Sequence, residues 1–268
     1  MSFLALENKN IIVFGVSNKR SIGWAIAKVL IQEGANVYLG VRNTAREEEV
    51  RAFADPKGFF HCDVESESEL EALGDAVAKA GIEIDGFVHS IAFANYEQAS
   101  SKFYDTRRKD YLQASQISAF SLVELSRVLK PSLKKTASIV SIGISSTEVT
   151  AENYGYMAPI KASLNAIIRY LAKSLSSDTE IRCNAVNAGP LKTRASAGIP
   201  GYLTNYLYAE KLTFRKRALE VEEVANTVAF LLSPRSSGIN GQAIVVNAGM
   251  DFNYFDQEIV EKAMKLES

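Results

Sequence analysis

The chain is poor in the residues that hold metals or form disulfides. Its 268 residues include only two cysteines, Cys62 and Cys183, and two histidines, His61 and His89. The cysteines stand far apart with no Cys-x-x-Cys spacing, so we predict no metal site and reduced thiols, as in a cytoplasmic protein. His89 ends an apolar run, where a buried structural histidine is expected rather than an acid or base.

The chain also has no large excess of charge of either sign, and it has no apolar run long enough to cross a membrane. The formal net charge is −1, which disfavours a nucleic-acid partner. No stretch reaches the roughly 18 apolar residues that would span a bilayer, and the first ten residues lack a basic start followed by an apolar run. We therefore expect no membrane association.

Short β-branched runs alternate with longer helical patterns along the whole chain. This alternation predicts an α/β fold, a single doubly wound Rossmann-type domain over 1–268 with about seven parallel strands and helices on both faces. The expected strands are 10–15, 35–41, 58–62, 84–92, 137–143, 181–189 and 241–249, and the expected helices are 22–33, 45–54, 66–80, 104–130, 158–176 and 221–232. Ligands of such sheets bind beyond the carboxyl ends of the strands, so the turns there are the candidate site.

The turn after the first strand reads "GVSNKRSIGWAIA" at 15–27. It lacks the ordinary GxGxxG fingerprint, but Gly15, Ser21 and Ile22 would leave backbone N–H groups and a hydroxyl at a helix N-terminus, where a dinucleotide pyrophosphate fits. The alternative is that Gly15 only makes a turn and Ser21 only caps the helix.

The next two strands end in residues suited to an adenosine. Asp63 can accept a hydrogen bond from an adenine amino group while Val64 packs on the ring; Asp63 could instead cap the helix that follows. Arg42 and Arg46 stand where NAD enzymes often place an acid, and arginine there suits a 2′-phosphate. NADPH is thus favoured weakly over NADH, with a surface arginine as the competing interpretation.

"ENYGYMAPIKASLNA" at 152–166 holds two tyrosines that could act with Lys161. A seven-residue offset would return Tyr154 to within about 20° of the lysine on a helix, whereas Tyr156 lies about 140° away. Pro159 implies that the helix begins near Ala158, which leaves Tyr154 on the preceding loop and weakens the angular argument. The residues alone leave the choice open.

These motifs, with "FVHSIAFA" at 87–94 and "AGPLKT" at 188–193, resemble the short-chain dehydrogenase/reductase superfamily, and within it the bacterial NAD(P)H-dependent enoyl-acyl-carrier-protein reductases. The similarity runs from about residue 3 to 250. It implies hydride transfer to the β carbon of a trans-2-enoyl thioester carried on acyl carrier protein, in fatty-acid synthesis. The Y-x6-K pair of that family matches Tyr154 and Lys161, whereas the more common Y-x3-K pattern would need a tyrosine at Met157.

The resemblance implies roles for further residues. Lys161 would hold the nicotinamide ribose, and a lid at about 193–212 would cover the acyl chain. The implied cofactor contacts are Gly15, Ser21, Ile22, Arg42, Asp63, Val64, Ser90, Ile91, Ala92, Lys161, Gly189, Pro190, Leu191 and Thr193; the implied substrate contacts are Ala92, Phe93, Ala94, Tyr154, Ile199 and Tyr202. A homotetramer is implied as well, and the basic residues Lys192, Arg194, Lys211, Arg215 and Arg217 would suit an acidic carrier protein.

Two positions depart from the family pattern. Ile144 stands where many members carry a second tyrosine near the substrate, so that role could fall to Ser145, Ser146 or Tyr156, and we keep Tyr156 as a candidate catalytic residue. Ala92 replaces a common glycine and would narrow the nicotinamide pocket, with consequences for inhibitors that stack there.

Two other functions remain open at this stage. One is a short-chain reductase that acts on a different enoyl or dienoyl thioester, and thioester selectivity would distinguish it. The other is an NADP sensor without turnover, which predicts a broken Tyr/Lys pair, whereas Tyr154 and Lys161 are both present.

Overall fold

The computed structural model describes residues 3–96, 102–151, 154–194 and 196–264. One parallel sheet forms its centre, with the strand order β3-β2-β1-β4-β5-β6-β7. The strands are β1 (Asn10–Phe14), β2 (Asn36–Val41), β3 (Gly58–His61), β4 (Ile84–His89), β5 (Leu133–Ile144), β6 (Arg182–Ala188) and β7 (Ala243–Val246). The winding direction reverses between β1 and β4, which confirms the predicted doubly wound sheet.

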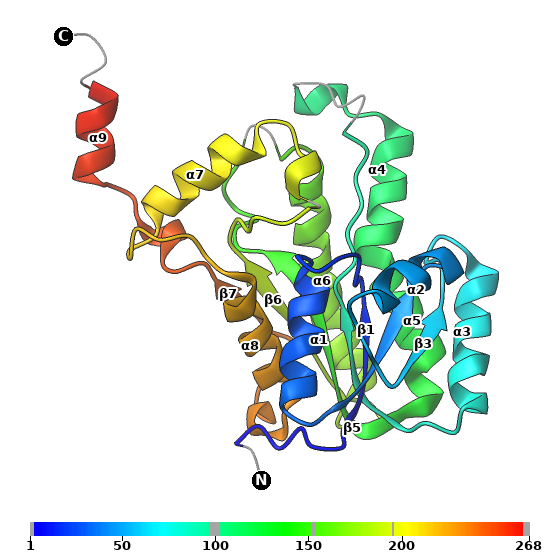
Figure 1. The fold of residues 1–268 in the computed structure, drawn as a ribbon. Helices are drawn as coiled ribbons and strands as arrows, with labels where there is room; N and C mark the ends of the chain where they lie inside the picture. The colour runs from blue at the N-terminus through cyan, green and yellow to red at the C-terminus, as the bar shows by residue number, and fades with distance from the viewer. Residues whose placement is uncertain (1–2, 97–101, 152–153, 195, 265–268) are drawn as a thin grey trace.

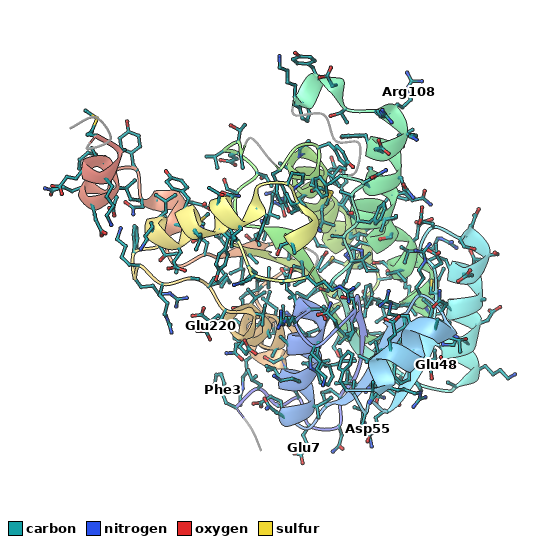
Figure 2. The ribbon with its side chains drawn as sticks, turned by 45° about the horizontal axis from the view of Figure 1, so that its top comes forward. Phe3, Glu7, Glu48, Asp55, Arg108 and Glu220 are labelled. Atoms are coloured by element: carbon teal, nitrogen blue, oxygen red, sulfur yellow. The ribbon has the colours of Figure 1, made fainter. Side chains whose placement is uncertain are left out.

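Helices cover both faces of this sheet (Figure 1). They are α1 (Ile22–Gln32), α2 (Thr44–Arg51), α3 (Glu67–Lys79), α4 (Arg108–Ser115), α5 (Ser121–Leu129), α6 (Met157–Leu175), α7 (Tyr202–Leu212), α8 (Val221–Leu232) and α9 (Gln257–Met264). Short 3-10 turns lie at Phe103–Asp105, Lys130–Ser132, Ser196–Gly198, Pro234–Ser236 and Met250–Phe252. Charged side chains such as Glu7, Glu48 and Asp55 project outward at the rim (Figure 2).

The apolar residues divide into two cores, one on each face. One core joins α3, α5 and α6 to the sheet, and the other joins α1 and α8 to it. All seven residues of β6 are buried, as expected for a strand covered on both sides. The short apolar runs of the sequence therefore correspond to strands that are buried on both faces, except for β3 and β7 at the edges of the sheet, most of whose residues are only partly buried or exposed.

The predicted continuous helix over 104–130 was wrong. A 3-10 turn at Phe103–Asp105 precedes α4, and a π-helical turn at Gln116–Phe120 separates α4 from α5. Ser121 follows that turn; its hydroxyl donates to the Ile117 main-chain oxygen at 2.7 Å and meets the His89 ring at 2.8 Å. Such π turns are often found at functional sites.

Helix α6 begins at Met157, one residue before the predicted start. Pro159 lies in its first turn, where its missing N–H has no intrahelical partner to lose. Tyr154 consequently precedes the helix, as the proline predicted. The segment 202–212, expected as part of a lid, is a regular helix, α7.

Candidate active site

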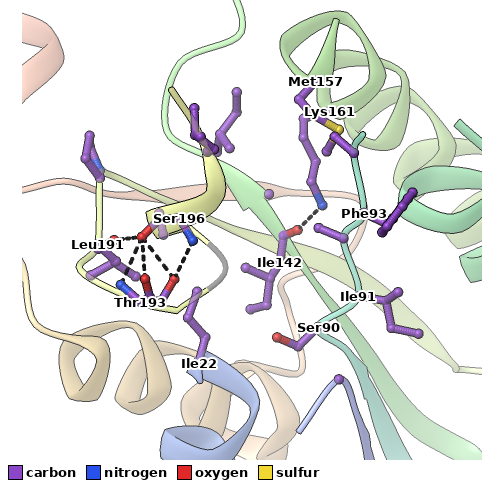
Figure 3. Close-up of a pocket in the computed structure, with 18 of the residues that line it drawn as sticks. Ile22, Ser90, Ile91, Phe93, Ile142, Met157, Lys161, Leu191, Thr193 and Ser196 are labelled. Carbon is purple, nitrogen blue, oxygen red and sulfur yellow. Dashed lines mark hydrogen bonds between the residues drawn. The ribbon is translucent and has the colours of Figure 1, made fainter. Parts of the chain in front are cut away.

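A large cavity opens at the carboxyl ends of the strands. Its volume is about 1270 Å³, and the turns after β1, β2, β3, β4, β5 and β6 all contribute to its wall. Every cofactor and substrate residue predicted from the sequence lines it, Arg46 included. Figure 3 shows part of this wall, with Lys161 and Ile142 facing Ser90 and Ile22 across it. The topology of the sheet thus brings together side chains that are far apart in the sequence.

The first turn requires glycine at position 15. Gly15 has a φ of +92°, and a Cβ built on it would lie 2.0 Å from the main-chain oxygen of Ser90. Ser21 is the N-cap of α1: its hydroxyl accepts from the N–H of Trp24 at 3.2 Å and donates to the Asn18 oxygen at 2.8 Å. The capping interpretation of Ser21 is therefore correct, and the capped helix N-terminus also faces the cavity.

Arg42 and Asp63, both predicted to contact the cofactor, contact each other. Nε and Nη2 of Arg42 each lie 2.6 Å from Oδ2 of Asp63, and Nη2 lies 3.5 Å from a carboxylate oxygen of Glu65. Arg46 pairs with Glu49 and reaches the main-chain oxygen of Ser17 at 3.5 Å. The helix that follows Asp63 is capped by Ser66, whose hydroxyl accepts from the N–H of Glu69.

Lys161 is a buried cation, with only 4% of its surface exposed. Its Nζ donates to the main-chain oxygen of Ile142 at 2.8 Å, and burial lowers the pKa of its ammonium group to about 8. Tyr154 lines the same cavity and packs against the core. Burial, helped by the neighbouring Tyr96 and Tyr202, raises the pKa of the Tyr154 phenol. At neutral pH the cavity therefore holds a charged lysine and a protonated tyrosine.

Tyr156 does not belong to the cavity wall in the part of the chain the structure describes. Its ring is buried in the core, stacked on Tyr96 and edge-on to Tyr111, and its hydroxyl donates to the main-chain oxygen of Asn95 at 3.0 Å. This placement does not support a direct part for Tyr156 in the chemistry. It supports a structural part, in which Tyr156 holds the segment near Asn95.

Three serines that the sequence did not single out hold the end of β4 and the segment after it. The hydroxyl of Ser118, in the π turn, accepts from the N–H of Phe93 at 2.9 Å and lies 3.1 Å from the oxygen of the same residue. Ser121 and Ser141 flank the buried His89, at 2.8 Å from Nε2 and 2.9 Å from Nδ1. Because the Ser121 hydroxyl donates to the main-chain oxygen of Ile117, its oxygen can accept a hydrogen bond from Nε2 of His89. Burial lowers the pKa of His89 to about 3, so its ring is neutral.

The turn after β6 is held by hydroxyl groups. Tyr202 bonds both the N–H and the oxygen of Leu191, at 2.9 and 2.8 Å. Ser196 bonds Thr193 and the oxygen of Leu191 (Figure 3). Tyr202 and Ile199, predicted as substrate contacts, both line the cavity, but the Tyr202 hydroxyl is engaged with the backbone.

Two of the basic residues that were expected to meet an acidic carrier protein form ion pairs with glutamates. Arg215 pairs with Glu223, and Arg217 lies 3.5 Å from Glu220. Within the described ranges no group of histidine, cysteine, aspartate and glutamate side chains could hold a metal ion. No described helix is both long and apolar enough to cross a membrane.

Comparison with known proteins gives consistent matches. Residues 15–251 match the family model described as Enoyl-(Acyl carrier protein) reductase. Enoyl-[acyl-carrier-protein] reductase [NADH] FabI of Enterococcus faecalis is 37% identical over 246 residues, 91% of this chain and 98% of that protein. The [NADPH] FabI of Staphylococcus aureus is 37% identical over 251 residues, 92% of this chain and 98% of that one.

Solved structures that are similar to this chain come from the same class of reductase. The enoyl-[acyl-carrier-protein] reductase (NADH) of Aquifex aeolicus superposes with a TM-score of 0.89 at 30% identity, covering 94% of this chain and 99% of that one. The enoyl-acyl carrier protein reductase of Bacillus cereus, with NADP⁺ and indole naphthyridinone, gives 0.86 at 33% identity, covering 94% and 98%.

Proposed function

The chain belongs to the enoyl-(acyl carrier protein) reductase family, and from that premise we propose which of its residues perform the reaction. It is an NAD(P)H-dependent oxidoreductase of fatty-acid synthesis that reduces the carbon–carbon double bond of an enoyl thioester. The observation that carries the assignment of the site is the buried, charged Lys161, which shares one cavity with a protonated Tyr154.

The residues present fit a dinucleotide. At Gly15 the chain passes too close to Ser90 for any side chain, and the N-terminus of α1 faces the cavity beside it, a suitable cradle for a pyrophosphate. Asp63 and Val64 would contact the adenine, and Thr193 and the Gly189–Leu191 turn would lie at the nicotinamide end. A lysine ammonium carries three donors, and the bond to Ile142 uses one, so Lys161 can also donate to ribose hydroxyls.

When bound, the reduced nicotinamide supplies a hydride to the β carbon of the enoyl thioester. Tyr154 donates a hydrogen bond to the thioester carbonyl oxygen, on which negative charge develops, and the resulting enolate takes a proton from water at its α carbon. Because its pKa is raised, the phenol keeps its proton and acts as a donor. The cationic Lys161 stabilises the developing charge and orients the ribose. The main chain of Ser90–Ala94, held by Ser118, forms the wall against which the reacting groups lie.

The acyl group would lie on the apolar side of the cavity. Phe93, Ala94, Ile199 and Tyr202 line it, and α7 would close over it as a lid. We further propose acyl carrier protein as the carrier of the substrate. Lys192, Arg194 and Lys211 are the basic residues that would meet its acidic surface, because Arg215 and Arg217 are already paired with glutamates.

A cytoplasmic homotetramer completes the proposal. Phe252, Tyr254 and Phe255 are largely exposed on the arm that leads to α9, which extends away from the sheet (Figure 1). Such apolar side chains would be covered in an oligomer. Cys62 and Cys183 are both free and buried, which suits a reducing compartment. Sedimentation velocity of the purified chain tests the assembly.

The direct test of the reaction follows the absorbance of the reduced nicotinamide with a trans-2-enoyl thioester on acyl carrier protein and on coenzyme A. Oxidation is expected with the carrier-bound substrate. Oxidation restricted to a dienoyl thioester would contradict the proposed substrate, and tight cofactor binding without turnover of any thioester would favour the sensor.

A further inference from the structure

Two carboxylates surround the guanidinium that would receive a 2′-phosphate. Asp63 holds Nε and Nη2 of Arg42 at 2.6 Å, and Glu65 lies 3.5 Å from Nη2. All three side chains line the cavity. The positive charge that favours NADPH is therefore already balanced before any cofactor binds.

Glu65 is held in this place from its other side. Nε2 of Gln113, on α4, donates to Oε1 of Glu65 at 2.8 Å, while Oε2 faces Arg42. Only 30% of the Glu65 side chain is exposed. A carboxylate anchored by an amide from another helix keeps its charge next to Arg42 better than a freely rotating surface glutamate would.

The two cofactors differ in how they meet this carboxylate. A 2′-phosphate would bring further negative charge beside Glu65 and would have to compete with it and with Asp63 for Arg42. A 2′-hydroxyl brings no charge and can donate a hydrogen bond to a carboxylate. We propose that Glu65 is a specificity-determining residue that reduces the preference for the phosphorylated dinucleotide. This inference rests on the proposed cofactor site.

Replacing Glu65 by glutamine keeps the shape of the side chain and removes its charge. Isothermal titration of Glu65→Gln with NADP⁺ and with NAD⁺ should show a preference for NADP⁺ that is roughly three- to tenfold greater than in the wild type. The kcat/KM ratio for NADPH over NADH should move in the same direction. The shift should shrink as salt is raised, because the effect is electrostatic at a partly exposed site.

Glu67→Gln is the matched control, since Glu67 is two residues away, exposed and outside the cavity wall. Its affinity ratio should change less than twofold. Gln113→Ala provides an independent variant: it releases Glu65 without changing the charge, so the preference should shift towards NADP⁺ by a smaller factor.

An unchanged NADP⁺ to NAD⁺ affinity ratio in Glu65→Gln, or a change equal to that in Glu67→Gln, would overturn the inference. Failure of the proposed cofactor site is distinguishable, because then the wild-type chain itself would bind neither dinucleotide.

Discussion

The ammonium nitrogen of Lys161 lies 2.8 Å from the main-chain oxygen of Ile142, inside the protein and at the wall of the cavity. Burial lowers the pKa of this lysine to about 8. If its charge supports catalysis, kcat/KM should fall as pH rises through about 8. The raised pKa of Tyr154 excludes the tyrosine as the cause of this fall.

The lowered pKa of Lys161 also affects the pH dependence of stability, and in the opposite direction to its effect on activity. Between about pH 8 and about 10.4 the unfolded chain still binds the Lys161 proton that the native protein has lost, so this group makes the native state more stable as pH rises. A pH profile of kcat/KM, with unfolding followed at each pH, checks both signs. A rate that stays level to pH 10 would contradict a catalytic part for the lysine charge.

Tyr154→Phe should lower kcat by roughly 10²-fold, because one hydrogen-bond donor to the developing oxyanion is removed. Tyr156→Phe is the matched control, since it deletes a hydroxyl that bonds Asn95 instead. We expect that variant to lose less than about tenfold. Steady-state kinetics of both variants decide between the tyrosines. A larger loss of kcat in Tyr156→Phe than in Tyr154→Phe would show that Tyr156 reaches the substrate.

Gly15→Ala should abolish dinucleotide binding, because a Cβ there would lie 2.0 Å from the Ser90 oxygen and would displace the first turn. Gly81→Ala is matched to it: Gly81 also has a positive φ, +65°, but no atom lies within 4 Å of its built Cβ. That control should lose about 1 kcal/mol of stability and keep its affinity for NADH. Calorimetric titration with NADH measures the affinity of both variants, and urea unfolding measures the stability of the Gly81→Ala control.

Ser118→Ala should lower kcat/KM about tenfold, because the Phe93 N–H loses its partner and the wall of the cavity shifts. Ser126→Ala removes another buried hydroxyl, one that bonds Leu122 within α5, away from the cavity. Its kcat/KM should be unchanged. Equal losses of activity in the two variants would indicate a general packing defect.

His89 should make stability depend on pH below neutrality. Its pKa is about 3 in the folded protein, against about 6.5 in an unfolded chain. As pH falls from 6.5 towards 3, the unfolded state binds a proton at His89 that the native state does not bind. The free energy of unfolding therefore falls by up to about 1.4 kcal/mol per pH unit. Urea unfolding at several pH values, at fixed protein concentration, should show a shallower slope for His89→Gln.

Local patterns predicted most of the sheet and the residues after each strand. The buried strands are apolar on both faces, and parallel topology then places the turn residues together without further information. The π turn escaped prediction because the helical pattern over 104–130 has no local break, and the contact of Ser121 with His89, 32 positions earlier, forms only in the folded chain. The part of Ser118 and the anchoring of Glu65 by Gln113 escaped for the same reason: each contact forms only in the folded chain. The choice between Tyr154 and Tyr156 stayed open because it depends on contacts that Tyr156 makes with Tyr96 and Asn95, far from it in the sequence.

The π turn at Gln116–Phe120 also makes the length of this segment informative. A π turn accommodates one more residue than an α-helical turn of the same height, so it holds a local surplus of chain. Deleting a single residue there would allow α4 and α5 to join as one regular helix, with the side chains of both helices still on the same faces. Family members that are one residue shorter in this segment should therefore lose the widened turn that carries Ser118, and with it the support of the cavity wall at Phe93, even where the lining residues are the same.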